Sequence, residues 1–203
     1  MVRRLVIAAV AVFVLGTLAL GGLAAYSTTL PEEDVLNDAA GRICRTIFVD
    51  RTDLPASPKI EFVNGVWSEL SLEEALRLFD EFKGSAPAEY RSRVEQTKQA
   101  YSANKPFYET SSIVFYRLSG DPDSVPRNNF QCRFAVTRDL AGHAESRLEL
   151  LYFDDRVVTR RDPAWQSLAT SSGLSPSGYV QPTLWFRIMA AVSPVYSVWA
   201  KFG

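Results

Sequence analysis

The run LVIAAVAVFVLGTLALGGLAA, residues 5–25, carries no charged side chain and directly follows Arg3 and Arg4. Its twenty-one residues would extend about 31 Å as an α-helix, which matches the hydrocarbon core of a bilayer. Lipid offers no hydrogen-bonding partner to the backbone, so the run must be helical wherever it crosses a membrane. Basic residues favour the cytoplasmic side. The sequence therefore predicts a transmembrane helix with a cytoplasmic N-terminus.

This run has two interpretations, an uncleaved anchor and a cleaved signal peptide. A signal peptide has a basic start, an apolar run of about 7–15 residues and small residues before the cleavage site. Gly22 and Ala24 could supply the small residues. The apolar run is longer than that range, however, and continues unbroken to the cleavage position. We therefore expect a signal-anchor over residues 1–27 that is retained in the mature protein.

Composition agrees with one domain on the far side of the membrane. The chain has 203 residues, which suits a single domain behind the anchor. Its net charge is −1 and its pI is near 5.9, so it lacks the cationic surface that a nucleic-acid partner requires. Arginine accounts for 17 of the 22 basic residues, which points to a GC-rich bacterial genome. We expect a single-pass protein of a bacterial inner membrane, with its domain in the periplasm or outside the cell.

The chain contains two cysteines, Cys44 and Cys132. In an oxidising compartment, an even pair within one small domain is most simply a disulfide. Redox-active pairs usually stand close together in a C-x-x-C motif, whereas these two cysteines are 88 positions apart. The spacing therefore predicts a structural bridge.

Three stretches carry the signals of helices. Pro31 and the acidic residues after it suit a first helical turn, and apolar residues then recur at three-four spacing. Ser71 and Glu74 form a capping-box pattern, which predicts a second helix that ends near Gly84. A third helix is expected over residues 87–104. Its thin apolar stripe predicts a position on the surface.

The strand signals fall into two groups. Asn64-Gly65 lies between two short apolar runs, which predicts a β-hairpin over residues 59–70. From residue 111 the apolar period changes to two. That period predicts a four-stranded antiparallel meander over residues 111–118, 130–138, 147–153 and 156–160. Helices followed by such a meander predict an α+β fold, with an extracytoplasmic domain over residues 28–178.

Residues 179–203 are expected to hold a C-terminal apolar and aromatic helix, in which residues 184–200 carry a single charge, Arg187. Helical spacing aligns one face of this segment, made of Trp185, Ile188, Met189, Val192, Tyr196 and Trp199. One interpretation is a helix that closes the domain core. The interpretation that we favour is a helix that docks on the membrane interface or on a membrane subunit, because tryptophan and tyrosine prefer the headgroup depth.

The sequence contains no recognisable catalytic motif. The single histidine, His143, has no cysteine, second histidine or carboxylate cluster near it in the sequence. Residues 102–105 match S-x-x-K without the companion motifs of the serine enzymes that use it. Neither a glycine-rich phosphate loop nor a C-x-x-C pair occurs. The sequence predicts no catalytic residue, no cofactor and no metal site.

These observations lead to one expected function and one alternative. We expect a non-catalytic accessory or assembly subunit of a larger membrane protein complex, with membrane lipid and other membrane protein subunits as partners. The alternative is an exported enzyme or small-ligand-binding domain that uses the concave face of the sheet. A pocket lined by Phe115, Phe134 and Tyr152 with a buried acid would favour that class. A structural protein of the cell envelope is a third option.

Overall fold

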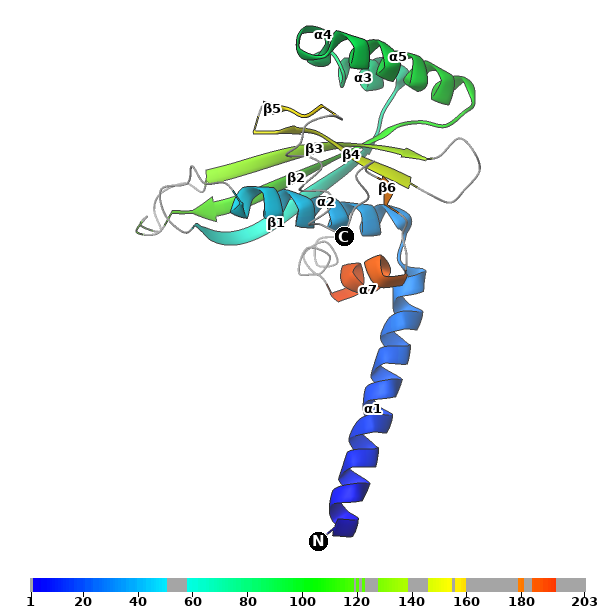
Figure 1. Ribbon diagram of the computed structural model, residues 1–203, viewed down its shortest axis with the longest axis vertical. Helices are drawn as coiled ribbons and strands as arrows, with labels where there is room; N and C mark the ends of the chain where they lie inside the picture. The colour runs from blue at the N-terminus through cyan, green and yellow to red at the C-terminus, as the bar shows by residue number, and fades with distance from the viewer. Residues whose placement is uncertain are drawn as a thin grey trace.

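The chain begins with a long helix, α1 (Val2–Thr29), which projects away from the other elements of the computed structural model (Figure 1). Its 28 residues correspond to about 42 Å of helix. Side chains of α1 are described from Val14 onward, apart from Leu20. The structure describes residues 2–50, 58–118, 120, 122, 128–138, 146–154, 156–159, 179–180 and 184–192.

Within the part of the chain whose side chains are described, no single helix is long and apolar enough to cross a membrane. Two helical segments, Val14–Thr29 and Glu33–Val49, meet at a bend of 104° and satisfy the same requirements when taken together. The expected transmembrane helix over Leu5–Ala25 is therefore not confirmed and stays a prediction.

Helix α2 (Glu32–Val49) confirms the first helix expected for the domain, with Pro31 at its N-cap. The residues at three-four spacing form a continuous buried face that lies on the sheet: Leu36, Ala39, Ala40, Ile43, Ile47 and Phe48. Strands contribute the other half of this main core through Val114, Phe130, Phe134, Val136, Leu148 and Leu150. Apolar periodicity in the sequence thus identified the correct face of the helix.

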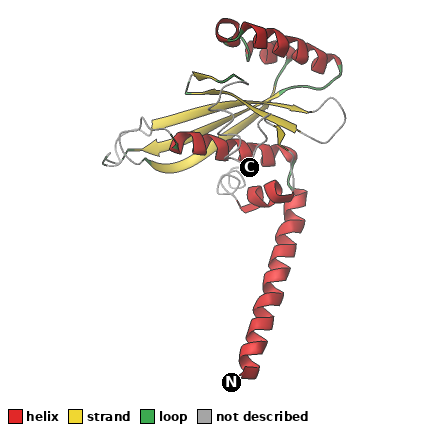
Figure 2. Ribbon diagram, in the orientation of Figure 1, coloured by secondary structure: helices red, strands yellow, loops and turns green. Residues whose placement is uncertain are grey.

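The sheet, whose strands are yellow in Figure 2, is antiparallel throughout. Its order is β1-β2-β3-β4-β5, with β6 paired to β4. Its strands are β1 (Lys59–Glu69), β2 (Tyr108–Arg117), β3 (Asn128–Arg138), β4 (Ser146–Phe153), β5 (Arg156–Val157) and β6 (Tyr179–Val180). The α+β class and the meander β2 to β5 are confirmed. The expectation of a four-stranded sheet is wrong, because among the described residues β1 and β6 extend it to six strands.

The hairpin predicted around Asn64-Gly65 is also wrong. Both residues lie inside the continuous strand β1, where Asn64 stands opposite Ile113 and Gly65 opposite Ser112. Pairing with β2 supplies hydrogen-bond partners for the backbone along almost the whole length of β1. A turn at Asn64-Gly65 would have divided β1 into two short strands, and an isolated hairpin of that kind is only marginally stable. A buried glycine in a strand interior marks a place where another part of the chain approaches closely. Long-range pairing therefore prevailed over the local turn signal.

Three short or surface helices form a second layer on the face of the sheet opposite α2 (Figure 1). They are α3 (Leu72–Arg77), α4 (Phe82–Ser85) and α5 (Pro87–Ser102), so the helix predicted to end near Gly84 is divided in two. The capping box is confirmed: the Ser71 amide donates to Glu74 Oε2 at 2.8 Å, and the Glu74 amide donates to Ser71 Oγ. The Ser71 hydroxyl, followed by its amide, holds the pKa of the Glu74 carboxyl below its usual value.

An ion pair ties this second layer to the sheet. Arg93 of α5 is buried and donates to both carboxylate oxygens of Glu149 in β4, at 3.0 and 2.9 Å. Glu89, one turn earlier in α5, accepts from the same guanidinium. The guanidinium carbon lies 4.6 Å from the centre of the Phe82 ring. The apolar contacts of this layer are Leu70, Phe79, Phe107, Ala135, Leu151 and Tyr152.

The helix predicted over residues 184–200 is present in its first nine residues as α7 (Leu184–Val192), and the remainder lies outside the described residues. It lies beside the C-terminal end of α1 and on the side of α2 that faces away from the sheet (Figure 1). The junction of α1, α2 and α7 therefore forms one end of the domain.

The substitution Arg93→Met is expected to lower the free energy of unfolding by about 3–5 kcal/mol, because it leaves a buried carboxylate without its partner. Denaturant unfolding of the full chain in detergent measures this change. Arg77→Met is the matched control, since Arg77 and Glu73 form a pair that is 70% and 75% exposed, and it should cost about 0.5 kcal/mol or less. A cost below about 1 kcal/mol for Arg93→Met would contradict the assignment.

Candidate functional site at the junction of α1, α2 and α7

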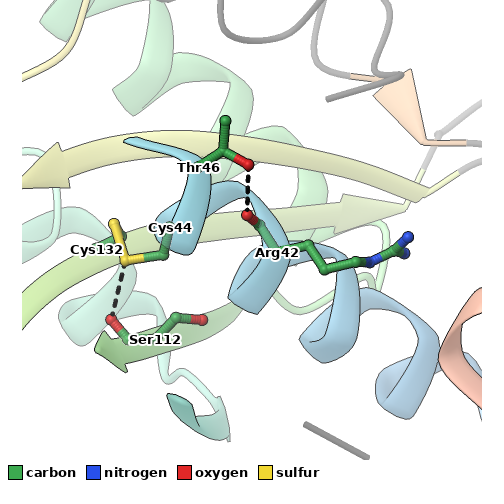
Figure 3. The surroundings of a disulfide bond; sticks show 5 residues. All are labelled: Arg42, Cys44, Thr46, Ser112 and Cys132. Carbon is green, nitrogen blue, oxygen red and sulfur yellow. Dashed lines mark hydrogen bonds between the residues drawn. A yellow bond between two sulfur atoms is a disulfide. The ribbon is translucent and has the colours of Figure 1, made fainter. Parts of the chain in front are cut away.

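The two cysteines form the predicted disulfide. Cys44 of α2 and Cys132 of β3 have an S–S distance of 2.10 Å and α-carbons 5.7 Å apart, and both residues are fully buried (Figure 3). The Ser112 carbonyl oxygen lies 3.5 Å from the Cys44 sulfur. Cys132 lies on the face of β3 that α2 covers, and Cys44 belongs to the same core. The bridge therefore joins α2 covalently to the middle of the sheet.

Replacement of both cysteines with serine is expected to destabilise the domain by about 4–5 kcal/mol, because the bridge closes a loop across a sequence separation of 88. The loss is measured as the change in unfolding free energy in denaturant. Each single substitution should cost as much as the double one, since either removes the whole bridge. A loss that adds over the two sites, or one below about 1 kcal/mol, would argue against a stabilising role.

The link between α1 and α2 is held by a side chain from the far end of the sequence. Arg187 of α7 donates from Nη1 to the carbonyl oxygen of Leu30, at 2.7 Å. Leu30 follows the last turn of α1, where carbonyl groups have no partner within the helix. The next residue, Pro31, has no amide hydrogen. A guanidinium is a favourable partner here because it also complements the negative end of the helix dipole.

Apolar packing accompanies this hydrogen bond. Ala190 of α7 is fully buried in a small cluster with Leu30 and Val35, and Ala191 packs against it. The junction thus combines one charge-assisted hydrogen bond with a short apolar contact between three helices. The sequence analysis did not assign this role to Arg187. A lone charge within an otherwise apolar helix was the signal that could have suggested it.

The residues predicted to dock on a membrane or a partner are only partly described. Ile188 and Met189 are half-buried and Val192 is 57% exposed. Trp185 belongs to α7, but its side chain lies outside the described part, and Tyr196 and Trp199 lie outside the described residues. The described part of α7 thus has one side on the domain and another that is open. The docking function of these residues stays a prediction.

Substitution of Arg187 with alanine is expected to loosen α7, since a hydrogen bond from a charged group is worth about 1.5–3 kcal/mol. Hydrogen exchange at the amides of residues 184–192 should quicken about tenfold or more, while exchange in β2 and β3 stays unchanged. Arg45→Ala serves as the control, because Arg45 is an exposed residue of α2. Unchanged exchange in α7 would show that the Leu30 contact does not hold the helix.

The residues named for a possible ligand pocket do not meet. Phe134 is buried in the core beneath α2, and Tyr152 is buried in the second core beneath α3 to α5. The sheet itself lies between these two cores. Phe115 is a half-buried residue of β2 next to Val114, which belongs to the core beneath α2. Phe115, Phe134 and Tyr152 therefore do not line one common cavity.

A small polar cleft occurs elsewhere on the sheet. It has a volume of about 180 Å³ and is lined by Glu81, Asn129, Gln131, Arg133, Tyr152 and Asp154. Arg133 donates to the Glu109 carboxylate at 2.6 Å, and the Tyr152 hydroxyl donates to the Leu78 carbonyl. Burial, followed by the nearby Glu81 carboxylate, raises the pKa of Tyr152 to about 12. Tyr152 therefore keeps its proton at neutral pH and cannot serve as a base there.

In the part of the chain that the structure describes, no group of three His, Cys, Asp or Glu side chains is placed to bind a metal ion. His143 lies outside the described residues. Comparison with protein-family models, with curated proteins and with solved structures gives no match for this chain. Any account of function must therefore rest on the geometry itself.

Proposed function

We propose that this protein is a membrane-anchored accessory or assembly subunit of a larger membrane protein complex, with an extracytoplasmic α+β domain and no catalysis of its own. The observation that carries the proposal is the position of α1, which projects from a domain that is bridged by a disulfide. Val14, Leu15 and Leu18 of α1 are 47%, 66% and 67% exposed. Apolar side chains gathered on a projecting helix need a cover other than water.

Three further observations support a membrane anchor and an extracytoplasmic domain. Helix α1 contains the whole uncharged run Leu5–Ala25, which is as long as a hydrocarbon core is thick. Arg3 and Arg4 precede the run and favour a cytoplasmic N-terminus. A buried disulfide at the centre of the domain suits an oxidising compartment such as the periplasm.

One part of the sheet supports a protein partner. Residues opposite each other in the β1–β2 pair share a face, and the face that carries Val66, Ile113 and Phe115 is turned away from α2. Helices α3 to α5 cover mainly the β3–β4 side of that face. Val66 is 47% exposed. The same face carries Glu109, which pairs with Arg133 of β3 at 2.6 Å, so apolar and paired charged side chains are both available there to a protein partner.

The anchor is tested on the protein in membranes of the cells that produce it. The mature protein should begin at the original N-terminus and should stay in the membrane pellet after carbonate extraction. A mature N-terminus near Ala25 or Tyr26, with release by carbonate, would instead show a soluble exported domain.

The partner is tested by affinity purification in mild detergent followed by mass spectrometry. Membrane subunits should co-purify with the wild-type chain and be lost with Val66→Glu. Val49→Glu is the matched control, because Val49 is 58% exposed at the end of α2 and lies outside the proposed face. Recovery of the protein alone, or equal loss with both variants, would contradict a subunit that binds through this face.

The polar cleft favours a second candidate, an exported domain that binds a small ligand or acts on it. Its lining offers a guanidinium, two carboxylates, two amides and a phenol within about 180 Å³. A thermal-shift screen of small polar compounds against the full chain tests this function. A compound that raises the melting temperature of the wild type and not of Gln131→Leu would favour the ligand-binding domain over the accessory subunit.

A further inference from the structure

We infer that α7 lies in the headgroup layer of the bilayer and fixes the tilt of the domain over the membrane. The inference rests on the proposed function, since α7 can reach lipid only where α1 is embedded. It goes further because it names what covers the open side of α7, which is lipid at the boundary between headgroups and acyl chains.

The first argument is the place of α7 in the fold. Helix α7 contacts α1 and α2, and it lies on the side of α2 that faces away from the sheet (Figure 1). That side is the end of the domain from which α1 emerges. The helix runs across the direction of α1, so a bilayer crossed by α1 would meet α7 along its length.

The second argument is the distribution of side chains around α7. Arg187 is its one charged residue, and the others are apolar. Ala190 marks the side that is buried against Leu30 and Val35. Positions 188 and 192 each lie two residues from Ala190, which is about 160° around an α-helix. Val192 is accordingly 57% exposed. The exposed apolar side of α7 therefore needs cover, because the described part of the protein covers only the side that carries Ala190.

The third argument selects lipid as the missing cover. The exposed apolar surface of α1 includes Leu18, about 17 Å of helix below Thr29, and α7 packs beside the C-terminal end of α1. The open side of α7 therefore continues the apolar surface that the proposed function places in lipid. Arg187 is directed to the Leu30 carbonyl, so the charge of α7 lies on the domain side and not on the open side. An apolar face beside a membrane helix suits an interfacial helix.

The consequence is a domain with two membrane attachments. A single helix leaves a domain free to tilt about the point where it emerges. A second contact at an angle to the first removes that freedom, and α7 runs across the direction of α1 (Figure 1). The β1–β2 face would then be presented to a partner in one orientation.

The test uses spin labels on the full chain in vesicles of phosphatidylethanolamine and phosphatidylglycerol. Single cysteines replace Leu18, Val66 and Val192 in separate variants, while the oxidised Cys44–Cys132 bridge does not react with the label. Collision with oxygen reports lipid and collision with a nickel chelate reports water. The label at position 18 should match the hydrocarbon core and the label at 66 should match water. The label at 192 should give a depth at the headgroup boundary.

Each contrary outcome has a separate meaning. If position 192 behaves like position 66 while position 18 lies in hydrocarbon, the inference about α7 is wrong and the anchor stands. If position 18 behaves like position 66, the proposed anchor is wrong and the inference falls with it. If position 192 is shielded from both reagents, protein covers α7 and the lipid assignment is overturned.

A second measurement separates docking from folding. In a chain labelled at position 188, Val192→Asp should shift the collision values toward those of position 66 and leave the melting temperature unchanged. Val49→Asp is the matched control for an added charge at an exposed valine, and it should shift neither quantity. A fall in the melting temperature with Val192→Asp alone would place this face in the domain core and overturn the inference.

Discussion

The packing of α2 against the sheet is the constraint on which the rest of the structure depends. Its buried face supplies half of the main core, and the Cys44–Cys132 bridge makes the contact covalent at its centre. Toward one end of α2, Phe48 packs on the rings of Tyr116 and Phe130, with centroids 4.5 and 5.5 Å away. Toward the other end, α2 meets α1 and α7. Because α2 is fixed on the sheet, it also determines where the junction with α1 and α7 lies relative to the sheet.

The two faces of the sheet are covered by different chemistry. The α2 layer is largely apolar and cross-linked, and the buried Thr110 hydroxyl of β2 also donates a hydrogen bond to Asn37 of α2. The α5 layer is largely polar in sequence, and it is positioned by Arg93, which joins Glu89 and Glu149 beneath the aromatic rings of the second core. A buried charge has few alternative positions that satisfy it. The ion pair thus specifies where the second layer sits, while the aromatic contacts supply the apolar stabilisation.

The sequence predicted those features that depend on local pattern. Three-four spacing identified α2, alternation identified β3 and β4, and the Ser71–Glu74 pattern identified the capping box. The disulfide followed from the number of cysteines and the expected compartment. Features that depend on distant pairing were missed. Asn64-Gly65 alone indicates a turn. Nothing near it in the sequence shows that β2 pairs with the residues before it and with the residues after it. The two-residue strand β6 is too short to show any period.

The lone charge of Arg187 indicates that it has a partner, but the sequence does not identify the Leu30 carbonyl as that partner, because 157 positions separate the two residues. The contact also explains why an apolar helix carries a charge at all. Arg187 is directed to the domain side, where its guanidinium donates to the carbonyl of the buried Leu30 in the link between α1 and α2. The same hydrogen bond joins the helix that is proposed to cross the membrane to the helix that is proposed to lie on it. Any rotation of α1 relative to the domain must therefore either break this bond or carry α7 along.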